Sequence, residues 1–272
     1  MILLPNAKIN LGLNVVRKRP DGYHDLETVF YPIPLYDRLE VTPLEGTEPY
    51  RLVMDGNAIE GTAEDNLVIK ALRLLQKEGF NIPAVQINLT KQIPSGAGMG
   101  GGSADAAFML RALNELFCLQ ISIPKLEEYA ARLGADCAIF IQNKPVYAEG
   151  IGNVFTEIDL DLRGYYLVVI KPDIFISTKA AFSQIRPSAS ANSLLDIIKR
   201  PVEEWKDFMY NDFEKSVFPQ FPEIARLKQQ LYDNGALYAA MSGSGSSLFG
   251  IFKTRQQLAE VFPGCFYTCL QL

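Results

Sequence analysis

The chain has 272 residues, a formal net charge of −5 at pH 7 and 48% hydrophobic residues. This apolar content is enough for a sizeable core in one large domain or two medium domains. Acidic and basic residues are interspersed, so the charge pattern argues against nucleic acid or an anionic membrane surface as a partner. No apolar run reaches the roughly 20 residues of a membrane span, and polar residues interrupt the apolar N-terminus, which argues against a signal peptide.

The numbers of cysteines and histidines limit which metal sites and disulfide bonds the chain can form. The four cysteines are scattered without a paired CxxC spacing, and the chain has one histidine. This composition predicts reduced thiols in a cytoplasmic protein and argues against a structural zinc site.

The first half of the chain predicts a mixture of strands and helices. Apolar and polar residues alternate over 8–15, which indicates a half-buried strand with Lys8 and Asn10 on its polar face. In chain order, the further expected elements are a helix over 64–80 capped by Asp65 or Asn66 and ended at Gly79, a strand over 85–90, a helix over 104–117 with Ser103 at or near its N-cap, and a helix over 123–134.

Around 150–163 the sequence becomes turn-like and polar, with EGIGN and DLDLRG, so we expect domains over 1–155 and 156–272. Because helices and strands mix without regular βαβ alternation, the predicted class is α+β. The expected elements are a strand over 165–172, a helix beginning at Ser177 or Thr178, a helix over 222–235, a strand-like segment over 238–252, a helix over 255–262 and a closing strand over 265–272.

Residues 94–104 read PSGAGMGGGSA, with five glycines in seven positions. A glycine-rich loop between a strand and a helix N-terminus is an anion site, because bare amides and the helix dipole favour a phosphate. A flexible loop or a tight packing corner is the alternative. The dinucleotide pattern GxGxxG fits Gly96, Gly98 and Gly101, but the following helix leads into another helix rather than a strand. The loop lacks the lysine of a P-loop, and the chain lacks the HRD and DFG segments of protein kinases.

Three segments in order resemble the motifs of the superfamily of galactokinase, homoserine kinase, mevalonate kinase and phosphomevalonate kinase. They are PNAKINLGL at 5–13 (motif 1), PSGAGMGGGSA at 94–104 (motif 2) and MSGSGSSLFG at 241–250 (motif 3). Within the superfamily, RPDGYHDLETVF at 19–30 and the later LGADCAIF and AEGIG resemble the branch that acts on a cytidine diphosphate-linked methylerythritol.

The resemblance implies a fold and a reaction. The expected architecture is an N-terminal domain like ribosomal protein S5 domain 2, a ferredoxin-like C-terminal domain and an active site in the cleft between them. The expected reaction uses ATP and Mg²⁺ to phosphorylate the 2-hydroxyl of the methylerythritol moiety in the non-mevalonate isoprenoid precursor pathway. The sequence leaves the oligomeric state open.

The resemblance also assigns residues. Lys8 and Asp136 take the catalytic positions, with Asp136 as general base, although Cys137 and Ala138 replace the family's usual Val-Pro. Ser103 is expected at Mg²⁺ or the β-phosphate, and Gly243 and Gly245 are expected to pack motif 3 against the phosphate region. The substrate-binding positions are Asn10, Tyr23, His24 and Phe182. The ATP-binding positions are Pro94, Ser95, Gly96, Ala97, Gly98, Met99, Gly100, Gly101, Gly102, Ser103, Ala104, Asn66 and Lys91.

Taken alone, several of these residues allow simpler interpretations. Asp136 and Ser103 are common helix-capping types, Lys8 could protect a strand edge, and DGYH could be a turn. At the level of function, the alternatives are another kinase of the same superfamily, a nucleotide-binding regulator without catalysis, and a nucleic-acid-binding module, which the acidic balance disfavours.

Overall fold

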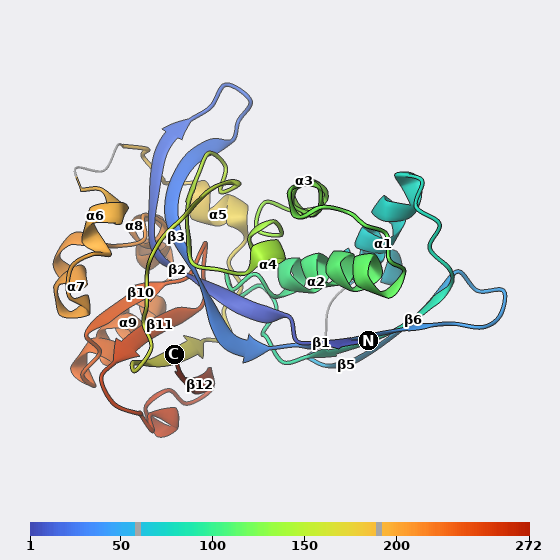
Figure 1. Cartoon of the computed structure of the whole chain (residues 1–272). Helices are drawn as coiled ribbons and strands as arrows, with labels where there is room; N and C mark the ends of the chain where they lie inside the picture. The colour runs from blue at the N-terminus through green and yellow to red at the C-terminus, as the bar shows by residue number, and fades with distance from the viewer. Residues whose placement is uncertain (58–60, 189–191) are drawn as a thin grey trace. The chain divides into compact units, whose positions relative to one another are not determined.

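The computed structural model describes residues 1–57, 61–188 and 192–272 (Figure 1). The chain divides into two compact units. Unit 1 contains Met1–Ala7, Leu35–Ser95 and Gly100–Lys144, and unit 2 contains Lys8–Pro34, Gly96–Met99 and Pro145–Leu272. The expected single boundary near residue 155 does not coincide with this division, because two early segments pack with the C-terminal part of the chain.

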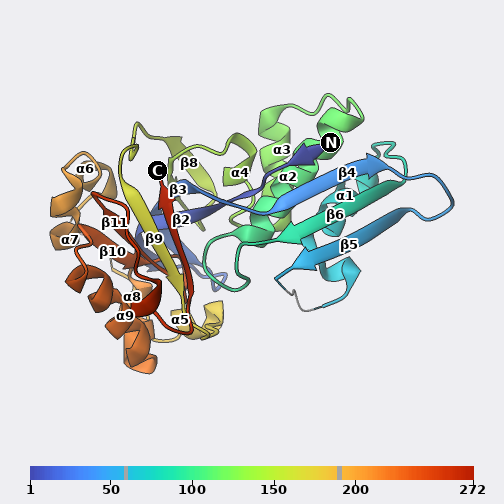
Figure 2. The ribbon, with the colours of Figure 1, turned by 90° about the horizontal axis from the view of Figure 1, so that it is seen from below.

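Unit 1 is built on a four-stranded sheet with the order β1-β4-β6-β5. Strand β6 alternates buried and half-buried side chains, because only one face of the sheet is covered. Helices α1, α2 and α3 lie on that face (Figure 2). The bounds are β1 Ile2–Leu3, β4 Arg38–Pro43, β5 Tyr50–Gly56, α1 Leu67–Lys77, β6 Val85–Lys91, α2 Gly101–Leu116, α3 Ile123–Leu133 and α4 Ile139–Gln142.

The helix starts in unit 1 follow from their capping residues. Helix α1 begins after Asn66, whose side chain accepts a hydrogen bond from the backbone N–H of Val68, as the sequence predicts. Helix α2 begins earlier than expected: Gly100 is its N-cap, in the left-handed conformation with φ of 70°, and Ser103 lies within the first turn. The expected cap at Ser103 is therefore wrong by about one turn, because a glycine takes up the left-handed backbone at the helix entry.

A buried ion cluster links β6, α2 and Asp37, the residue just before β4, in unit 1. The side chain of Lys91, at the end of β6, is 2% exposed and forms ion pairs with Asp37 and with Asp105 of α2, the latter at 2.5 Å. Asp37 also accepts the backbone N–H of Ile93 at 2.9 Å. Burial raises the pKa of Asp105 to about 7, against the opposing effect of Lys91. One ammonium group thus compensates two buried carboxyl groups next to the start of motif 2.

We predict that Lys91→Met lowers the free energy of unfolding by about 3–5 kcal/mol, because it leaves buried carboxylates without their cation. The loss should be larger at pH 8 than at pH 5, since Asp105 then ionises in the apolar interior. Urea unfolding of both proteins at the two pH values measures this. Lys253→Met, which breaks an exposed pair with Glu203, is the control and should change stability little. Equal effects of the two substitutions would contradict a structural role for the cluster.

The C-terminal sheet of unit 2 has the order β10-β11-β9-β12, with antiparallel neighbours. This is the strand order of a βαββαβ ferredoxin-like arrangement. The first crossover contains helices α8 and α9, whose buried residues share one hydrophobic core with the sheet. The bounds are β9 Tyr166–Lys171, α5 Thr178–Phe182, α6 Leu194–Ile197, α7 Trp205–Phe208, α8 Phe213–Gln220, α9 Pro222–Asp233, β10 Tyr238–Met241, β11 Leu248–Phe252 and β12 Phe266–Gln271.

The second crossover is not the helix that the sequence predicts over 255–262. It contains only a 3₁₀ turn at Ala259–Val261. The hydroxyl of Tyr267 on β12 accepts the N–H of Leu258 at 3.0 Å and donates to the carbonyl of Gln256 at 3.1 Å. These backbone groups are therefore satisfied by a side chain of the sheet, which competes with an α-helical hydrogen-bond pattern.

A further sheet has the order β2-β3-β7-β8. Its strands are β2 Asn6–Lys18, β3 His24–Tyr36, β7 Val146–Glu149 and β8 Val154–Glu157. Strand β2 was expected to expose one face, but both faces are buried from Asn6 to Val15. In unit 2, residues of motif 2 and motif 3 cover the polar face. The predicted α+β class is confirmed.

Candidate functional site

Lys8 occupies the middle of the candidate site in unit 2. Its side chain is buried although it carries a charge, and the whole residue is 2% exposed. The ammonium group donates to the Oδ1 atom of Asn10 at 2.7 Å and to the carbonyl oxygen of Gly98 at 3.2 Å, and it lies 4.8 Å from the ring centroid of Phe30. A buried ammonium held at a defined position can stabilise negative charge that develops on a phosphoryl group.

Ser242 connects the three motifs. Its hydroxyl donates to the carbonyl of Gly98 at 2.9 Å and accepts the backbone N–H of Asn10 at 3.3 Å. The N–H of Lys8 also donates to the carbonyl of Met99 at 3.0 Å. Residues from motif 1, motif 2 and motif 3, far apart in sequence, are thus joined by hydrogen bonds within unit 2.

Asn10 is oriented by a chain of buried hydrogen bonds. Its Nδ2 donates to the hydroxyl of Thr28 on β3 at 2.8 Å, and that hydroxyl donates to the carbonyl of Gly12 at 2.6 Å. The Oδ1 atom of Asn10 is therefore turned toward Lys8. Ser242 and Thr28 were not predicted from the sequence, although both lie within quoted motifs. The alternation of serine and glycine in motif 3 was the available signal for Ser242.

Gly98 allows two backbone segments to approach closely. Its φ is +70°, and a Cβ atom at this position would overlap the carbonyl oxygen of Ser242 and lie 3.0 Å from its carbon. The neighbouring Ala97 and Met99 are buried. Gly96, Gly98 and Gly100 have positive φ and alternate with Ala97 and Met99, which do not, and N–H groups of such an alternating backbone can converge on an anion.

We predict that Gly98→Ala is more destabilising than Gly235→Ala. Both glycines have positive φ, but a Cβ at Gly235 meets nothing within 4 Å. The left-handed backbone costs about 1–2 kcal/mol in either variant, and the overlap with Ser242 should add about 1–3 kcal/mol in Gly98→Ala. Thermal and urea unfolding measure the difference. Equal losses would show that motif 3 does not constrain the loop at Gly98.

In unit 1, the first turn of α2 lies beside the turn that carries Asp136. Gly100 provides no side-chain cap, so the helix N-terminus is formed by the backbone of Gly101, Gly102 and Ser103. Ser103 hydrogen-bonds the thiol of Cys137, and burial raises the pKa of that thiol to about 12. Cys137 is therefore a neutral packing group at physiological pH. Asp136 precedes α4 by a turn and is half-buried, and its charge acts on the Cys137 thiol.

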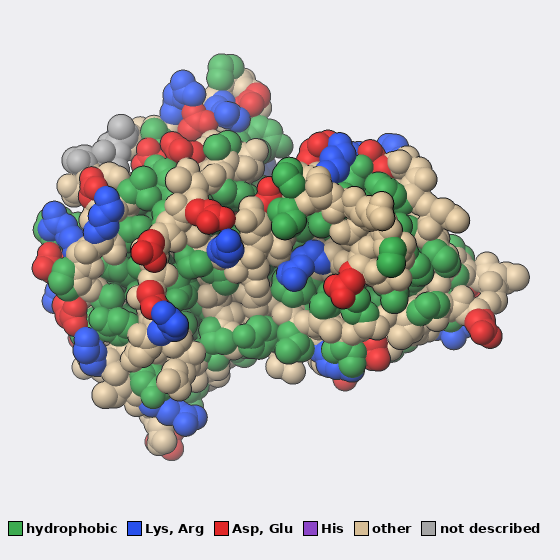
Figure 3. All heavy atoms as spheres, viewed as in Figure 1, with side chains coloured by type: hydrophobic (Ala, Val, Ile, Leu, Met, Phe, Trp, Pro, Cys, Tyr) green, Lys and Arg blue, Asp and Glu red, His purple; other side chains and the backbone are tan. Residues whose placement is uncertain are grey.

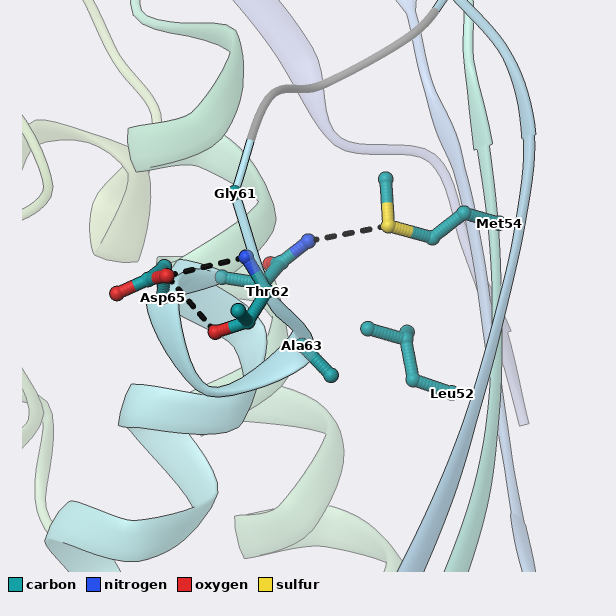
Figure 4. A pocket seen from close by; sticks show the side chains of 7 residues that line it. Leu52, Met54, Gly61, Thr62, Ala63 and Asp65 are labelled. Carbon is teal, nitrogen blue, oxygen red and sulfur yellow. Dashed lines mark hydrogen bonds between the residues drawn. The ribbon is translucent and has the colours of Figure 1, made fainter.

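A pocket of about 280 Å³ lies in unit 1 next to Asn66 (Figure 4). Leu52 and Met54 of β5 face the turn that precedes α1, and the Nδ2 atom of Asn66 donates to the sulfur of Met54 at 3.4 Å. The lining residues are Leu52, Met54, Gly61, Thr62, Ala63, Asp65 and Asn66. An apolar wall with a few polar groups at one side is typical of a small-molecule site.

Lys91 does not line this pocket. Its ammonium group forms ion pairs with Asp37 and Asp105, so its side chain is part of the buried interior of unit 1. Asn66 and Lys91 are both expected near the same ligand, but only the side chain of Asn66 lines the pocket. Of the remaining loop residues, Pro94 is half-buried, Ser95 and Gly96 are exposed, and Ala104 is fully buried.

The rings of His24 and Phe182 stack directly in unit 2, with centroids 4.6 Å apart and planes at 22°. Phe182 also meets Phe213 edge to face. Burial and then the charge of Lys18 lower the pKa of His24, so its imidazole is neutral at pH 7. Tyr23 is 62% exposed. Of the expected aromatic residues, the structure therefore brings His24 and Phe182 together, and His24 occupies one face of the Phe182 ring.

Charged side chains fix the hairpin that carries His24. Asp25 forms ion pairs with Arg17 at 2.6 Å and with Arg19 at 2.7 Å. Figure 3 shows lysine, arginine and acidic side chains together at this hairpin of β2 and β3, while both signs are mixed over the rest of the face shown. The hairpin therefore holds its own shape through local ion pairs.

Two broader searches cover the described residues. Within residues 1–57, 61–188 and 192–272, no helix is long and apolar enough to cross a membrane. In the same part of the chain, no three His, Cys, Asp or Glu side chains are grouped so that they could hold a metal ion.

Comparison with known proteins adds to this geometry. Residues 66–144 match the family model of the GHMP kinases N terminal domain, and residues 193–263 match that of the GHMP kinases C terminal domain. A 4-diphosphocytidyl-2-C-methyl-D-erythritol kinase of Bacteroides fragilis is 61% identical, covering 96% of this chain and 95% of its own. The chain belongs to the GHMP kinase family.

The resemblance inferred from the three motifs is thereby confirmed. A relative of the same name from Bacteroides thetaiotaomicron is 55% identical over 100% of this chain and 99% of its own. A crystal structure of a 4-(cytidine 5'-diphospho)-2C-methyl-D-erythritol kinase matches with a TM-score of 0.82 and 29% identity, covering both chains fully.

Proposed function

We propose that this GHMP kinase transfers the γ-phosphoryl group of ATP to the 2-hydroxyl of 4-(cytidine 5'-diphospho)-2-C-methyl-D-erythritol, giving the 2-phosphate and ADP. The observation that carries the proposal is the hydrogen-bonded group of Lys8, Asn10, Gly98 and Ser242, which joins the three kinase motifs around a buried ammonium. The names of the most similar relatives supply the acceptor.

We assign the ATP subsites to features of motif 2 and its surroundings. The pocket beside Asn66 suits adenine, and the loop at Gly96–Gly102 with the N-terminus of α2 suits the phosphates. Mg²⁺ would bind mainly through phosphate oxygens and water, with the Ser103 hydroxyl as a protein ligand, because three acidic or histidine ligands are not grouped in the described residues. When bound, the ion neutralises charge on the phosphates.

The chemistry needs one proton transfer and one phosphoryl transfer. In our assignment, the carboxylate of Asp136 accepts the proton of the acceptor hydroxyl. The hydroxyl oxygen then forms a bond to the γ-phosphorus as the bond to the β-phosphate oxygen of ATP breaks and ADP leaves. The ammonium of Lys8, held by Asn10 and the carbonyl of Gly98, stabilises the negative charge on the transferring group.

We assign the cytosine to the aromatic residues of the hairpin and α5. A base can stack on Phe182 in place of His24, and the neutral imidazole of His24 can then hydrogen-bond the edge of the base. Tyr23, which is largely exposed, provides a second aromatic surface. We place the enzyme in the cytoplasm, because its cysteines are free thiols.

The direct test is release of ADP by the purified protein with a panel of acceptors. The panel contains the cytidine diphosphate-linked methylerythritol, its uridine analogue, homoserine and mevalonate. We expect turnover with the cytidine compound and a clear preference over the uridine analogue, whose ring exchanges a donor and an acceptor. Turnover of homoserine or mevalonate alone would support another kinase of the family, and no turnover would support a nucleotide-binding regulator.

We predict that Asp136→Asn lowers kcat by on the order of 10²–10⁴, because the amide keeps the shape of the side chain but cannot accept a proton. The Kd for ATP, measured by calorimetry, should remain close to that of the wild type. Asp161→Asn, at a solvent-exposed aspartate paired with Arg163, is the matched control and should retain full turnover. Near-normal kcat in Asp136→Asn would remove this residue from the role of base.

We predict that Tyr23→Ala and His24→Ala each raise the KM for the acceptor by about one order of magnitude, since an aromatic stack on Tyr23 contributes roughly 1–3 kcal/mol and a hydrogen bond from His24 about 0.5–1.5 kcal/mol. The KM for ATP should change little, because adenine is assigned to the pocket beside Asn66. Steady-state kinetics with each substrate varied in turn, together with the melting temperature, measure this. A matched rise of both KM values would indicate that DGYH is a structural turn.

A further inference from the structure

A short segment between α7 and α8 lies against motif 1 without belonging to any of the three motifs. Asn211 is completely buried, and its backbone forms a parallel bridge with Leu13 of β2. The N–H of Leu13 donates to the carbonyl of Tyr210 at 3.1 Å, and the N–H of Asp212 donates to the carbonyl of Leu13 at 2.8 Å. The segment therefore pairs with β2 through backbone hydrogen bonds, although it does not belong to the regular sheet β2-β3-β7-β8.

The side chain of Asn211 contacts the residues on both sides of Ser242. Its Nδ2 donates to the carbonyl of Met241 at 2.7 Å and to the carbonyl of Gly243 at 2.8 Å. Its Oδ1 accepts the N–H of Phe213 at 3.0 Å. Both amide protons and the amide oxygen are used, so only an amide of this length satisfies the three backbone groups. A carboxylate at the same position would set oxygen against two carbonyl oxygens.

Two acidic neighbours fix this segment in turn. Glu214 accepts the N–H of Met241 at 2.8 Å with one oxygen and pairs with Lys228 of α9 at 2.6 Å with the other. Asp212 accepts the N–H of Val15 at 2.7 Å. The segment from Tyr210 to Glu214 is thus anchored to β2, to the end of β10 and to α9, which holds Asn211 against motif 3.

We propose that Asn211 is a positioning residue of the phosphoryl-transfer site, acting through Ser242. By holding the carbonyls on both sides of Ser242, it aims the Ser242 hydroxyl at the carbonyl of Gly98 and the N–H of Asn10. The same Gly98 carbonyl and the same Asn10 side chain are acceptors for the ammonium of Lys8. Three hydrogen-bond contacts therefore link Asn211, through Ser242 and the Gly98 carbonyl, to the ammonium of Lys8, to which we assign stabilisation of the transferred phosphoryl.

The kinetic part of this inference depends on the proposed kinase function. A residue that only stabilises the fold would lower the melting temperature and leave the turnover of the folded protein unchanged. A residue that positions Lys8 through Ser242 lowers kcat per folded enzyme and leaves the KM values for ATP and acceptor nearly unchanged. The two roles are therefore separable by measurement.

The experiment compares Asn211→Asp, Asn211→Ala, Ser242→Ala and the double variant Asn211→Ala with Ser242→Ala. We expect kcat to fall about 10-fold or more in each Asn211 variant, with both KM values within about 3-fold of the wild type. The kcat of the double variant should be at most about 3-fold lower than that of Ser242→Ala, because both substitutions interrupt the same chain of contacts. Multiplicative losses, or an unchanged kcat in Asn211→Asp, would overturn the proposal.

Two further measurements separate the possible failures. Ile224→Ala, which opens a cavity in α9, is the stability control: it should lower the melting temperature and retain kcat. Hydrogen exchange of the Asn10 amide, which donates to Ser242, should speed up at least 10-fold in Asn211→Ala and in Ser242→Ala, whatever the acceptor is. Unchanged exchange in Asn211→Ala would contradict the positioning role even if the acceptor assignment is wrong. If Asn211→Asp does not fold, Asn211→Ser replaces it.

Discussion

The carbonyl oxygen of Gly98 is the contact on which the candidate site depends. It accepts hydrogen bonds from the ammonium of Lys8 and from the hydroxyl of Ser242, one from motif 1 and one from motif 3. Two donors can converge on one carbonyl because the oxygen has two lone pairs. The convergence requires that Gly98 has no side chain, since a Cβ would overlap the backbone of Ser242. Three motifs that are far apart in the sequence thus meet at one crowded point in unit 2.

The two buried lysines of the chain show how surroundings decide the role of a charge. Lys91 is enclosed with two carboxyl groups, and its cluster connects β6, α2 and the start of motif 2. In unit 2, the ammonium group of Lys8 donates to an amide oxygen and to a backbone carbonyl, and it lies beside an aromatic ring. Desolvation makes either charge costly on its own, so each is fixed by its partners. The structure therefore separates a lysine that stabilises unit 1 from one that we assign to catalysis.

The sequence predicts the parts of the fold that depend on local pattern. The strand at β2, the start of α1 at Asn66 and the grouping of three motifs follow from alternation, capping and family resemblance. Lys91 could also have been placed, because it continues the buried series of Val85, Ile87 and Leu89 in β6. The failed helix at 255–262 and the role of Asn211 depend on side chains of distant strands, and such hydrogen bonds leave no periodic trace in the sequence.

The absence of a side chain has different physical causes at different glycines of motif 2. Gly98 admits the backbone of motif 3, Gly100 supplies the left-handed entry to α2, and a Cβ at Gly101 would lie 2.9 Å from Ile93. The fold itself requires these three. At Gly102, by contrast, φ is not positive, the residue is exposed, and a Cβ would meet only Leu67 at an ordinary 3.7 Å. Packing within unit 1 does not explain the missing side chain there. Our assignment of a phosphate to the amides at the N-terminus of α2 would explain it, because a ligand held by backbone N–H groups needs this space.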